Sequence, residues 1–273
     1  MALLAALSDA DGAVPKARML RLVLLPIGFA VAAIALWQIL CQALHIPQIL
    51  LPPPSAVWTV LHNNYAILFG ETLPTLSESV LSFAVASALG VGLAVALTFS
   101  AWVREALYPS IVVFQLIPKI ALAPLFIVWL GVGETTSVVV AVFIAFFPIV
   151  VSSATGLVSA NPEVLRLCES LTASEWQAFR MVRFPYALPY IFAGMKVGVT
   201  MAMIGVVVGE FITAQHGLGY IIMFAAGAGE TATVLAAIVL LCVIGLGLYG
   251  VVGLAELLVL RSYGGQAPIS GVI

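Results

Sequence analysis

Six long apolar stretches, separated by shorter polar segments, dominate the pattern along the chain. Each is on the order of 20 residues or more, the length that an α-helix needs to cross the hydrocarbon core of a bilayer. Helices are expected because lipid cannot hydrogen-bond to exposed backbone groups. The pattern therefore predicts an all-α, polytopic membrane protein with six transmembrane helices, at residues 20–44, 76–99, 108–130, 136–158, 186–213 and 232–260.

The basic residues that flank the predicted spans fall in alternate connections, and so on one side of the membrane, at Lys16, Arg18, Arg21, Arg104, Arg166, Arg180, Arg183 and Arg261. The other three connections contain neither lysine nor arginine: 45–75, 131–135 and 214–231. Since basic connections remain in the cytoplasm, both termini are predicted to be cytoplasmic. The chain then divides into a cytoplasmic tail at 1–19, a transmembrane domain at 20–260 and a second cytoplasmic tail at 261–273.

The composition agrees with a membrane protein and narrows its function. Hydrophobic residues make up 63% of the chain and charged residues only 8%, with a mean hydropathy of +1.20. A net charge of -2 gives no reason to expect nucleic-acid binding. Cys41, Cys168 and Cys242 are far apart, as expected for small buried hydrophobes rather than a disulfide or metal set. The start, MALLAALSDADG, lacks the basic region of a cleaved signal peptide.

One substantial polar segment, residues 161–189, interrupts the apolar pattern between the fourth and fifth spans. Asn161-Pro162 predicts a helix start, because asparagine caps free N–H groups and proline fits the first helical position. Ser174 and Gln177 have the spacing of a capping box for a second short helix. Two capped helices too polar for lipid indicate docking onto a cytoplasmic partner, with an ordinary solvated loop as the alternative.

Charged and aromatic residues inside the predicted spans are candidates for a solute pathway. Lys119, one turn after Gln115, lies between two prolines, and an intramembrane lysine is costly unless it is paired or hydrated. The alternative is that Lys119 extends to the cytoplasmic face. Glu210 has no basic neighbour in sequence, so its expected partners are backbone donors, water or a group on another span. Phe146 and Phe147 either line a pore or pack in the core.

Small residues and one histidine complete the candidates in the second half of the chain. Glycines at 194, 198, 205 and 209 fall on one helical face, where two copies of the chain could pack closely. His216, in a predicted external connection, either contacts a docking protein or is simply exposed. No GxxxxGK[ST] phosphate loop and no HExxH, CxxC or GxSxG motif occurs in the sequence. The chain is therefore not expected to be an enzyme, to hold a metal or to bind ATP in the usual way.

The run RLCESLTASEWQAFRMVRFPYALPYIFAGMKVG resembles the cytoplasmic EAA loop of binding-protein-dependent ABC importer permeases. The likeness rests on Ala173-Ser174, Trp176-Gln177, Phe184-Pro185, Leu188-Pro189 and Gly194. It is weaker in the first half of the loop, where the family's glycine falls at Thr172. The segments LPPPSAVW, FQLIPKIALAPLFIVWLGVGE and AFFPIVVSSATGL are similar to the nitrate/sulfonate/taurine branch of these permeases. AQHGLGYIIMFAAGAGET matches the family's external re-entrant segment.

The resemblance implies a permease subunit in a bacterial inner membrane, surrounded by lipid and present in two copies. Two ATP-binding subunits that use ATP and magnesium would bind at a cytoplasmic coupling loop, 159–185, and an external binding protein would deliver the solute. The coupling residues would be Arg166, Glu169, Thr172, Ala173, Ser174, Trp176, Phe179 and Arg180. The solute pathway would include Gln115, Lys119, Phe146, Phe147 and Glu210.

The resemblance leaves the solute open among nitrate, sulfonates, taurine, aromatic acids and pyrimidine or flavin precursors, and Lys119 favours an anion. This chain itself would bind no cofactor. The alternative function is a stand-alone secondary carrier coupled to protons or sodium through Glu210 and Lys119. A carrier of that kind has no partner for a cytoplasmic pair of helices, and the sequence shows no repeated half.

Overall fold

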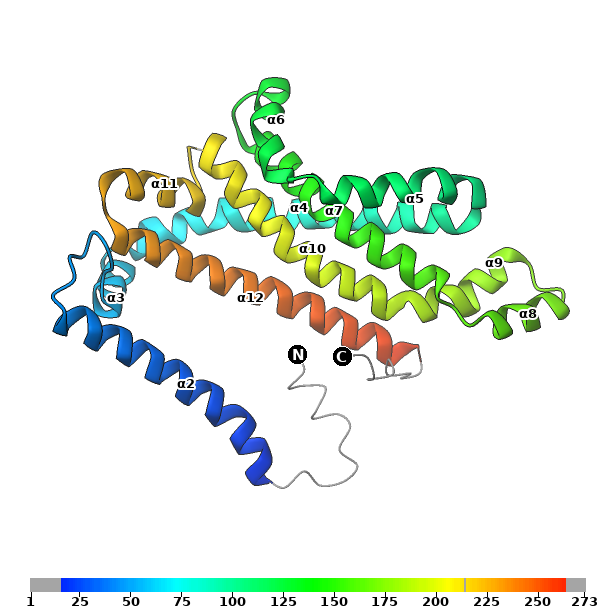
Figure 1. Ribbon diagram of the computed structural model, residues 1–273, viewed down its shortest axis with the longest axis horizontal. Helices are drawn as coiled ribbons and strands as arrows, with labels where there is room; N and C mark the ends of the chain where they lie inside the picture. Colours follow the sequence, from blue (N-terminus) through cyan, green and yellow to red (C-terminus); the bar gives the residue numbers. More distant parts are fainter. Residues whose placement is uncertain (1–15, 214, 264–273) are drawn as a thin grey trace.

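The structure, a computed structural model, describes residues 16–213 and 215–263, and every regular element in these ranges is helical. Figure 1 shows long helices lying side by side, with short helices at both ends of the bundle and a further short helix, α6, projecting from its middle. This confirms the predicted all-α fold. The elements are α2 (Lys16–Ala43), α3 (Pro54–Asn63), α4 (Tyr65–Phe99), α5 (Ala101–Leu116), the 3-10 helix η1 (Lys119–Leu122), α6 (Ala123–Leu130), α7 (Glu134–Val158), α8 (Pro162–Ser170), α9 (Glu175–Ala178), the π-helical turn η2 (Phe179–Arg183), α10 (Phe184–Thr213), α11 (Leu218–Ala228) and α12 (Thr231–Ser262).

Five helices in the described ranges are long and apolar enough to cross a membrane, and the bent pair α5 and α6 makes a sixth if counted as one span. The predicted spans correspond to these elements, with one large change of boundary. Helix α4 begins at Tyr65 rather than near 76. The sequence pattern placed the start of this span too late because the first turns of α4 carry polar side chains. Thr75 and Glu78 are buried against protein, so these turns remain helical despite their polarity.

The third predicted span is not one kinked helix. It begins earlier, at Ala101, where the Ser100 hydroxyl accepts a hydrogen bond from the Val103 N–H at 3.3 Å. It then breaks after Leu116 and turns by 88° into the second half. Ile117 is extended, with φ -66° and ψ 133°, because the ring of Pro118 disfavours a helical residue before it. Pro124 lies in the first turn of α6, where no N–H is needed, and therefore starts a helix instead of kinking one.

Helices α7 and α10 form the centre of the bundle, and small residues let their backbones approach closely. A Cβ atom added at Gly205 would lie 2.5 Å from Ala141 Cα, and one at Gly209 would lie 2.5 Å from Ser137 Cα. The glycines at 194 and 198 likewise face α7. The expectation that this glycine face packs against a second copy is therefore wrong. It is already occupied by α7 of the same chain, because a groove of this depth accepts only one helix.

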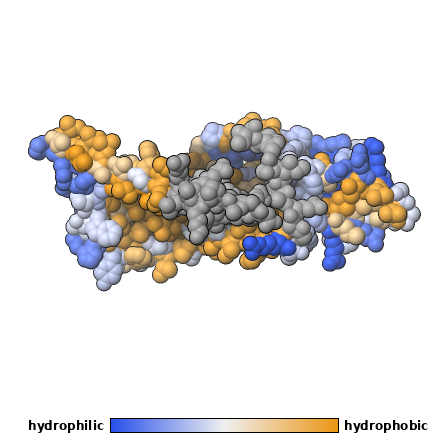
Figure 2. Space-filling view, turned by 90° about the horizontal axis from the view of Figure 1, so that it is seen from below, coloured by the Kyte–Doolittle hydropathy of each residue, from blue (hydrophilic) through white to orange (hydrophobic). Residues whose placement is uncertain are grey.

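Helix α2 lies apart from the rest of the bundle and connects to it through α3 (Figure 1). Gln38 donates to the Ser55 hydroxyl at 3.1 Å and accepts from the Ser55 N–H at 3.0 Å. Most large side chains of α2 are exposed, as are many on the outer helices. The visible face in Figure 2 is apolar along its middle and more hydrophilic towards its two ends. This distribution is that of a bundle lying across a bilayer.

Candidate functional site

The predicted coupling loop forms two short helices at one end of the bundle, where α8 and α9 project beyond the long helices (Figure 1). Both predicted caps are present. The Glu163 N–H donates to Asn161 Oδ1 at 2.8 Å, at the start of α8. The Gln177 N–H donates to Ser174 Oγ at 3.3 Å, and the Ser174 N–H donates to Gln177 Oε1 at 2.8 Å. The capping box therefore fixes the start of α9, as its spacing predicts.

The turn between these helices is made by Thr172 in a left-handed conformation, with φ 57°. The Thr172 N–H donates to the Glu169 carbonyl and the Ala173 N–H to the Cys168 carbonyl, each at 3.0 Å. This is the Schellman pattern that usually ends with glycine. Thr172 does form the turn, as expected, but a β-branched residue is strained at positive φ.

Aromatic stacking attaches the second helix of the loop to the end of α4. The ring centroids of Phe99 and Trp176 lie 6.0 Å apart, those of Phe99 and Phe179 4.9 Å, and those of Trp176 and Phe179 5.4 Å. Phe179 is only 6% exposed, so it supports the loop from inside and does not meet a partner directly. Trp176 remains 58% exposed. Phe179 therefore anchors the loop, whereas Trp176 both anchors the loop and remains accessible at its surface.

Helix α8 presents an apolar stripe that the chain itself does not cover. Val164, Leu167 and Leu171 recur along one helical face and are 40%, 58% and 70% exposed. Arg166 and Glu169 are exposed on the same helix. An amphipathic helix whose apolar side faces outward, beyond the ends of the long helices, has the form of helices that dock into a groove of another protein.

The break between α5 and α6 brings three of the predicted pathway residues together. The Lys119 ammonium donates to the Gln115 carbonyl at 2.8 Å and lies 5.1 Å from the centre of the Phe147 ring. The lysine therefore supplies a donor to the end of α5, where carbonyls lack helical partners. Phe147 is 5% exposed and packs in the core, as its alternative predicted. Phe146 is partly buried and packs against the hydrophobic core cluster that contains Phe147.

Glu210 lies elsewhere, in a fully enclosed site where α10 meets α4 and α11. Its Oε1 accepts from the Thr75 hydroxyl at 2.6 Å, and its Oε2 accepts from the Gly219 N–H at 2.7 Å. These are a group on another span and a backbone donor, two of the partners expected from the sequence. The residue before Glu210, Gly209, packs on Ser137 of α7. Ser137 is ten residues from Phe147, which is about 15 Å along a helix, so Glu210 lies well away from the site around Lys119. The place of Glu210 on a solute pathway stays a prediction.

The same site holds the whole first turn of α11. The Gly217 N–H donates to Glu71 Oε2 at 2.6 Å and the Leu218 N–H donates to the Thr75 hydroxyl at 2.8 Å. With the bond to Glu210, three consecutive N–H groups at the start of α11 are satisfied by side chains of α4 and α10. Negative charge is favourable at a helix N-terminus, where these groups have no helical acceptor. We call Glu71, Thr75 and Glu210 the α11 clamp.

Four polar residues inside the long helices were not predicted as site residues from the sequence: Glu71, Thr75, Glu78 and Glu256. The first three recur at helical spacing within an apolar stretch, a signal that could have been used. Glu78 is 7% exposed, and its Oε2 has no hydrogen-bond partner among the described residues. Glu256 forms an ion pair with Lys196 that joins α12 to α10. Its sequence signal was its position, because an acid within an apolar span is a candidate functional residue.

His216 and helix α11 lie at the end of the bundle that is predicted to be external. His216 Nε2 lies 3.4 Å from Glu134 Oε1, and both side chains are exposed, so His216 has a neighbour within the chain. The segment after α10, predicted to be external, contains a short apolar helix, α11, and its re-entrant position stays a prediction. Among the described residues no group of three potential metal ligands comes together.

Comparison with known proteins adds a family and several relatives. Residues 86–259 match the family described as "Binding-protein-dependent transport system inner membrane component". The riboflavin transport system permease protein of Chloroflexus aurantiacus is 34% identical over 82% of this chain and 85% of its own length. The formylaminopyrimidine transport permease protein of Halalkalibacterium halodurans is 32% identical, over 71% and 78%. The taurine transport system permease protein of Escherichia coli is 29% identical, over 82% and 84%.

The fold also matches a solved structure. An inward-facing structure of the MetNI methionine ABC transporter contains a chain that aligns with a TM-score of 0.60. The alignment covers 71% of this chain and 95% of that chain, at 20% sequence identity. At this identity the likeness concerns the fold, and it confirms the helical architecture expected from the sequence.

Proposed function

The chain belongs to the family of binding-protein-dependent transport system inner membrane components, and we propose that it moves a small solute across the membrane by alternating access. It is an ABC importer permease subunit of the branch that includes the taurine, sulfonate and nitrate permeases. Its work is transport, and the hydrolysis of ATP with magnesium belongs to partner subunits. The permease relatives favour this function over the stand-alone carrier.

The observation that carries the proposal is the uncovered apolar stripe of α8. It lies within the matched segment, on a loop that is capped at both helix starts and anchored by stacked rings. An outward-facing helix in a loop that is attached to the long helices can transmit movement between them and a partner. We assign this surface to an ATP-binding subunit, one for each of two copies of the permease. Both chain termini then lie in the cytoplasm, and an external binding protein supplies the solute.

The docking role is tested by placing a charge on the stripe. We expect Leu167→Asp to abolish co-purification of the cognate ATP-binding subunit, while the permease still inserts in the membrane. Leu50→Asp is the matched control, because Leu50 is 72% exposed in the connection at the other end of the bundle. Full association and full uptake with Leu167→Asp would show that α8 is not the docking surface.

The solute pathway is assigned to the break between α5 and α6, at Gln115, Lys119, Phe146 and Phe147. An ammonium group beside aromatic rings attracts anions and planar solutes. The relatives are named for riboflavin, formylaminopyrimidine, taurine and nitrate, so we assign the solute to small anions and heterocycles, organic or inorganic. Glu210 contributes by holding α11 in place, since both of its carboxylate oxygens accept hydrogen bonds.

The pathway is tested by uptake into vesicles that contain the assembled complex, its binding protein and ATP. We expect Lys119→Leu to reduce the rate of uptake per assembled complex, and Lys119→Glu to reduce it further if the solute is an anion. Lys119→Arg keeps the charge and should retain most of the rate. Wild-type uptake by Lys119→Leu would place this lysine in the scaffold.

A further inference from the structure

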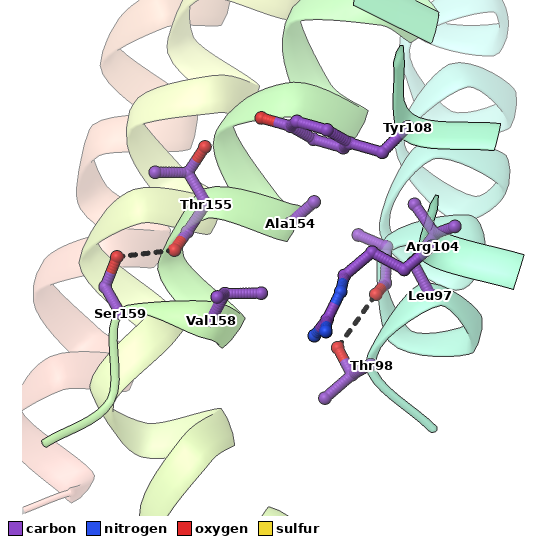
Figure 3. Close-up of a pocket in the computed structure, with 9 residues that line it drawn as sticks. Leu97, Thr98, Arg104, Tyr108, Ala154, Thr155, Val158 and Ser159 are labelled. Carbon is purple, nitrogen blue, oxygen red and sulfur yellow. Dashed lines mark hydrogen bonds between the residues drawn. The ribbon is translucent and has the colours of Figure 1, made fainter. Parts of the chain in front are cut away.

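A cavity of ≈ 250 Å³ lies between the ends of α4, α5 and α7, on the side that the basic residues predict to be cytoplasmic. Figure 3 shows Arg104 and Tyr108 of α5 facing the last turns of α7 across the hollow. Thr98 of α4 and two hydroxyl residues of α7, Thr155 and Ser159, also line the cavity, and the remaining lining is aliphatic. The cavity is separate from the break near Lys119 and from the α11 clamp.

The positive charge in this cavity has no ion-pair partner among the described residues. In the ranges that the structure describes, Arg104 takes part in neither of the two ion pairs, Lys196 with Glu256 and His216 with Glu134. Its side chain is only partly exposed. A guanidinium offers five N–H donors in a fork that fits a phosphate or carboxylate, and the Tyr108 hydroxyl offers one more. A half-enclosed site with free donors and a positive charge is built for an anion.

The other polar groups of the cavity act as acceptors. The hydroxyls of Thr98, Thr155 and Ser159 donate to carbonyls of their own helices, at 3.0, 2.8 and 2.6 Å respectively. Their protons are therefore used, while their lone pairs remain available to a ligand that carries donors of its own. The cavity thus has an anion-binding side on α5 and a hydroxyl-accepting side on α4 and α7. The headgroup of phosphatidylglycerol, a phosphodiester that carries a diol, has both features.

The level of the cavity fits a lipid headgroup. Arg104 follows the end of α4 by five residues, at the depth where a span leaves the hydrocarbon and enters the headgroup layer. Basic pockets between transmembrane helices on the cytoplasmic side are recognised sites for anionic headgroups. The aliphatic part of the lining, Ala94, Leu97, Ala154 and Val158, offers a surface against which the first carbons of an acyl chain would pack.

We propose that this cavity binds the phosphate of an anionic phospholipid from the cytoplasmic leaflet, with Arg104 as the charge contact and Tyr108 as a second donor. Thr98 directly precedes Phe99, the ring to which the coupling loop is attached, and Ser159 directly precedes the segment that leads into α8. A bound lipid therefore braces the junction between the spans and the coupling loop. This site does not depend on the proposed transport function, because it is defined by a binding measurement alone.

The test is native mass spectrometry of the purified, delipidated full-length protein, titrated with phosphatidylglycerol or phosphatidylcholine of the same acyl chains. We expect the wild type to bind one phosphatidylglycerol at least about tenfold more tightly than phosphatidylcholine, since charge-assisted hydrogen bonds are the strong ones. Arg104→Gln should lose this preference, Arg104→Lys should keep part of it, and Tyr108→Phe should weaken it by a smaller factor.

Arg261→Gln is the matched control, because Arg261 is an exposed arginine at the same predicted face, at the end of α12. It should keep the wild-type preference. A wild type without preference overturns the proposal, as does an equal loss in Arg104→Gln and Arg261→Gln, which would indicate diffuse attraction. A third arm uses inorganic phosphate alone. If phosphate displaces phosphatidylglycerol in an Arg104-dependent way at equal concentration, the site takes free phosphate and the lipid assignment is wrong.

Discussion

The two short-helix units, α11 and the α8–α9 loop, are attached to the long helices in opposite ways. Helix α11 is held by directional hydrogen bonds from its first three N–H groups to Glu71, Thr75 and Glu210. Glu210 is 1% exposed, so the bonds that it accepts from Thr75 and Gly219 are buried. The coupling loop is held by stacked rings around Phe99, while α8 leaves its apolar stripe uncovered.

The two kinds of attachment allow different amounts of movement. Buried hydrogen bonds to charged groups have one good geometry, and breaking them leaves polar groups without partners. Stacked rings tolerate small shifts of angle and position with little loss. The α11 end is therefore the fixed part of the molecule, and the coupling loop is attached firmly enough to transmit force but remains free to adjust to a partner.

The largest effect is expected from removing the clamp. Glu210→Leu leaves the Thr75 hydroxyl and the Gly219 N–H without their acceptor, at a cost of about 1–3 kcal/mol for each. We expect a marked fall in the thermal unfolding temperature of the purified protein, measured by size-exclusion chromatography after heating. Amide exchange at residues 217–228 should rise more than elsewhere.

Two variants sharpen this result. Glu210→Gln keeps one oxygen acceptor in the same shape and should have an intermediate effect. Glu105→Leu makes the same chemical change at an exposed glutamate of α5 and should leave stability nearly unchanged. Equal stability of Glu210→Leu and the wild type would mean that the clamp does not hold α11.

A smaller effect is expected from loosening the coupling loop. Phe99→Ala removes two ring contacts, with Trp176 and Phe179, each worth about 0.5–1.5 kcal/mol beyond its buried area. We expect faster limited proteolysis within 159–183, with the exchange of α11 amides unchanged. Phe69→Ala is the control, because Phe69 is 60% exposed on the same helix. A loop that stays protected in Phe99→Ala would place its attachment elsewhere.

The smallest effect concerns Thr172, and its sign is opposite. Thr172→Gly relieves the left-handed strain of a β-branched residue, which costs about 1 kcal/mol. We expect slower exchange of the Ala173 amide, which donates to the Cys168 carbonyl. Thr172→Ala keeps a Cβ atom at positive φ and should change little. Faster exchange in Thr172→Gly would show that the threonine turn is not strained.

Local features of this protein followed from its sequence. The apolar lengths predicted which segments cross the membrane, and Asn161, Ser174 and Gln177 predicted the starts of the two coupling helices. These signals are reliable because caps and span lengths depend on residues that are neighbours in sequence. The break before Pro118 is a local feature of the same kind, since the residue before a proline avoids the helical conformation.

Only the tertiary structure decided which elements meet. The glycine face of α10 receives α7 rather than a second copy, the span at Pro118 turns by 88°, and Glu210 meets Thr75, a residue 135 positions away in sequence. A face of glycines predicts that another helix packs closely there, and a buried acid predicts a hydrogen-bond donor beside it. Many segments of the chain could supply either one. Which one does is fixed by the packing of the whole bundle, because each side of a helix can be occupied only once.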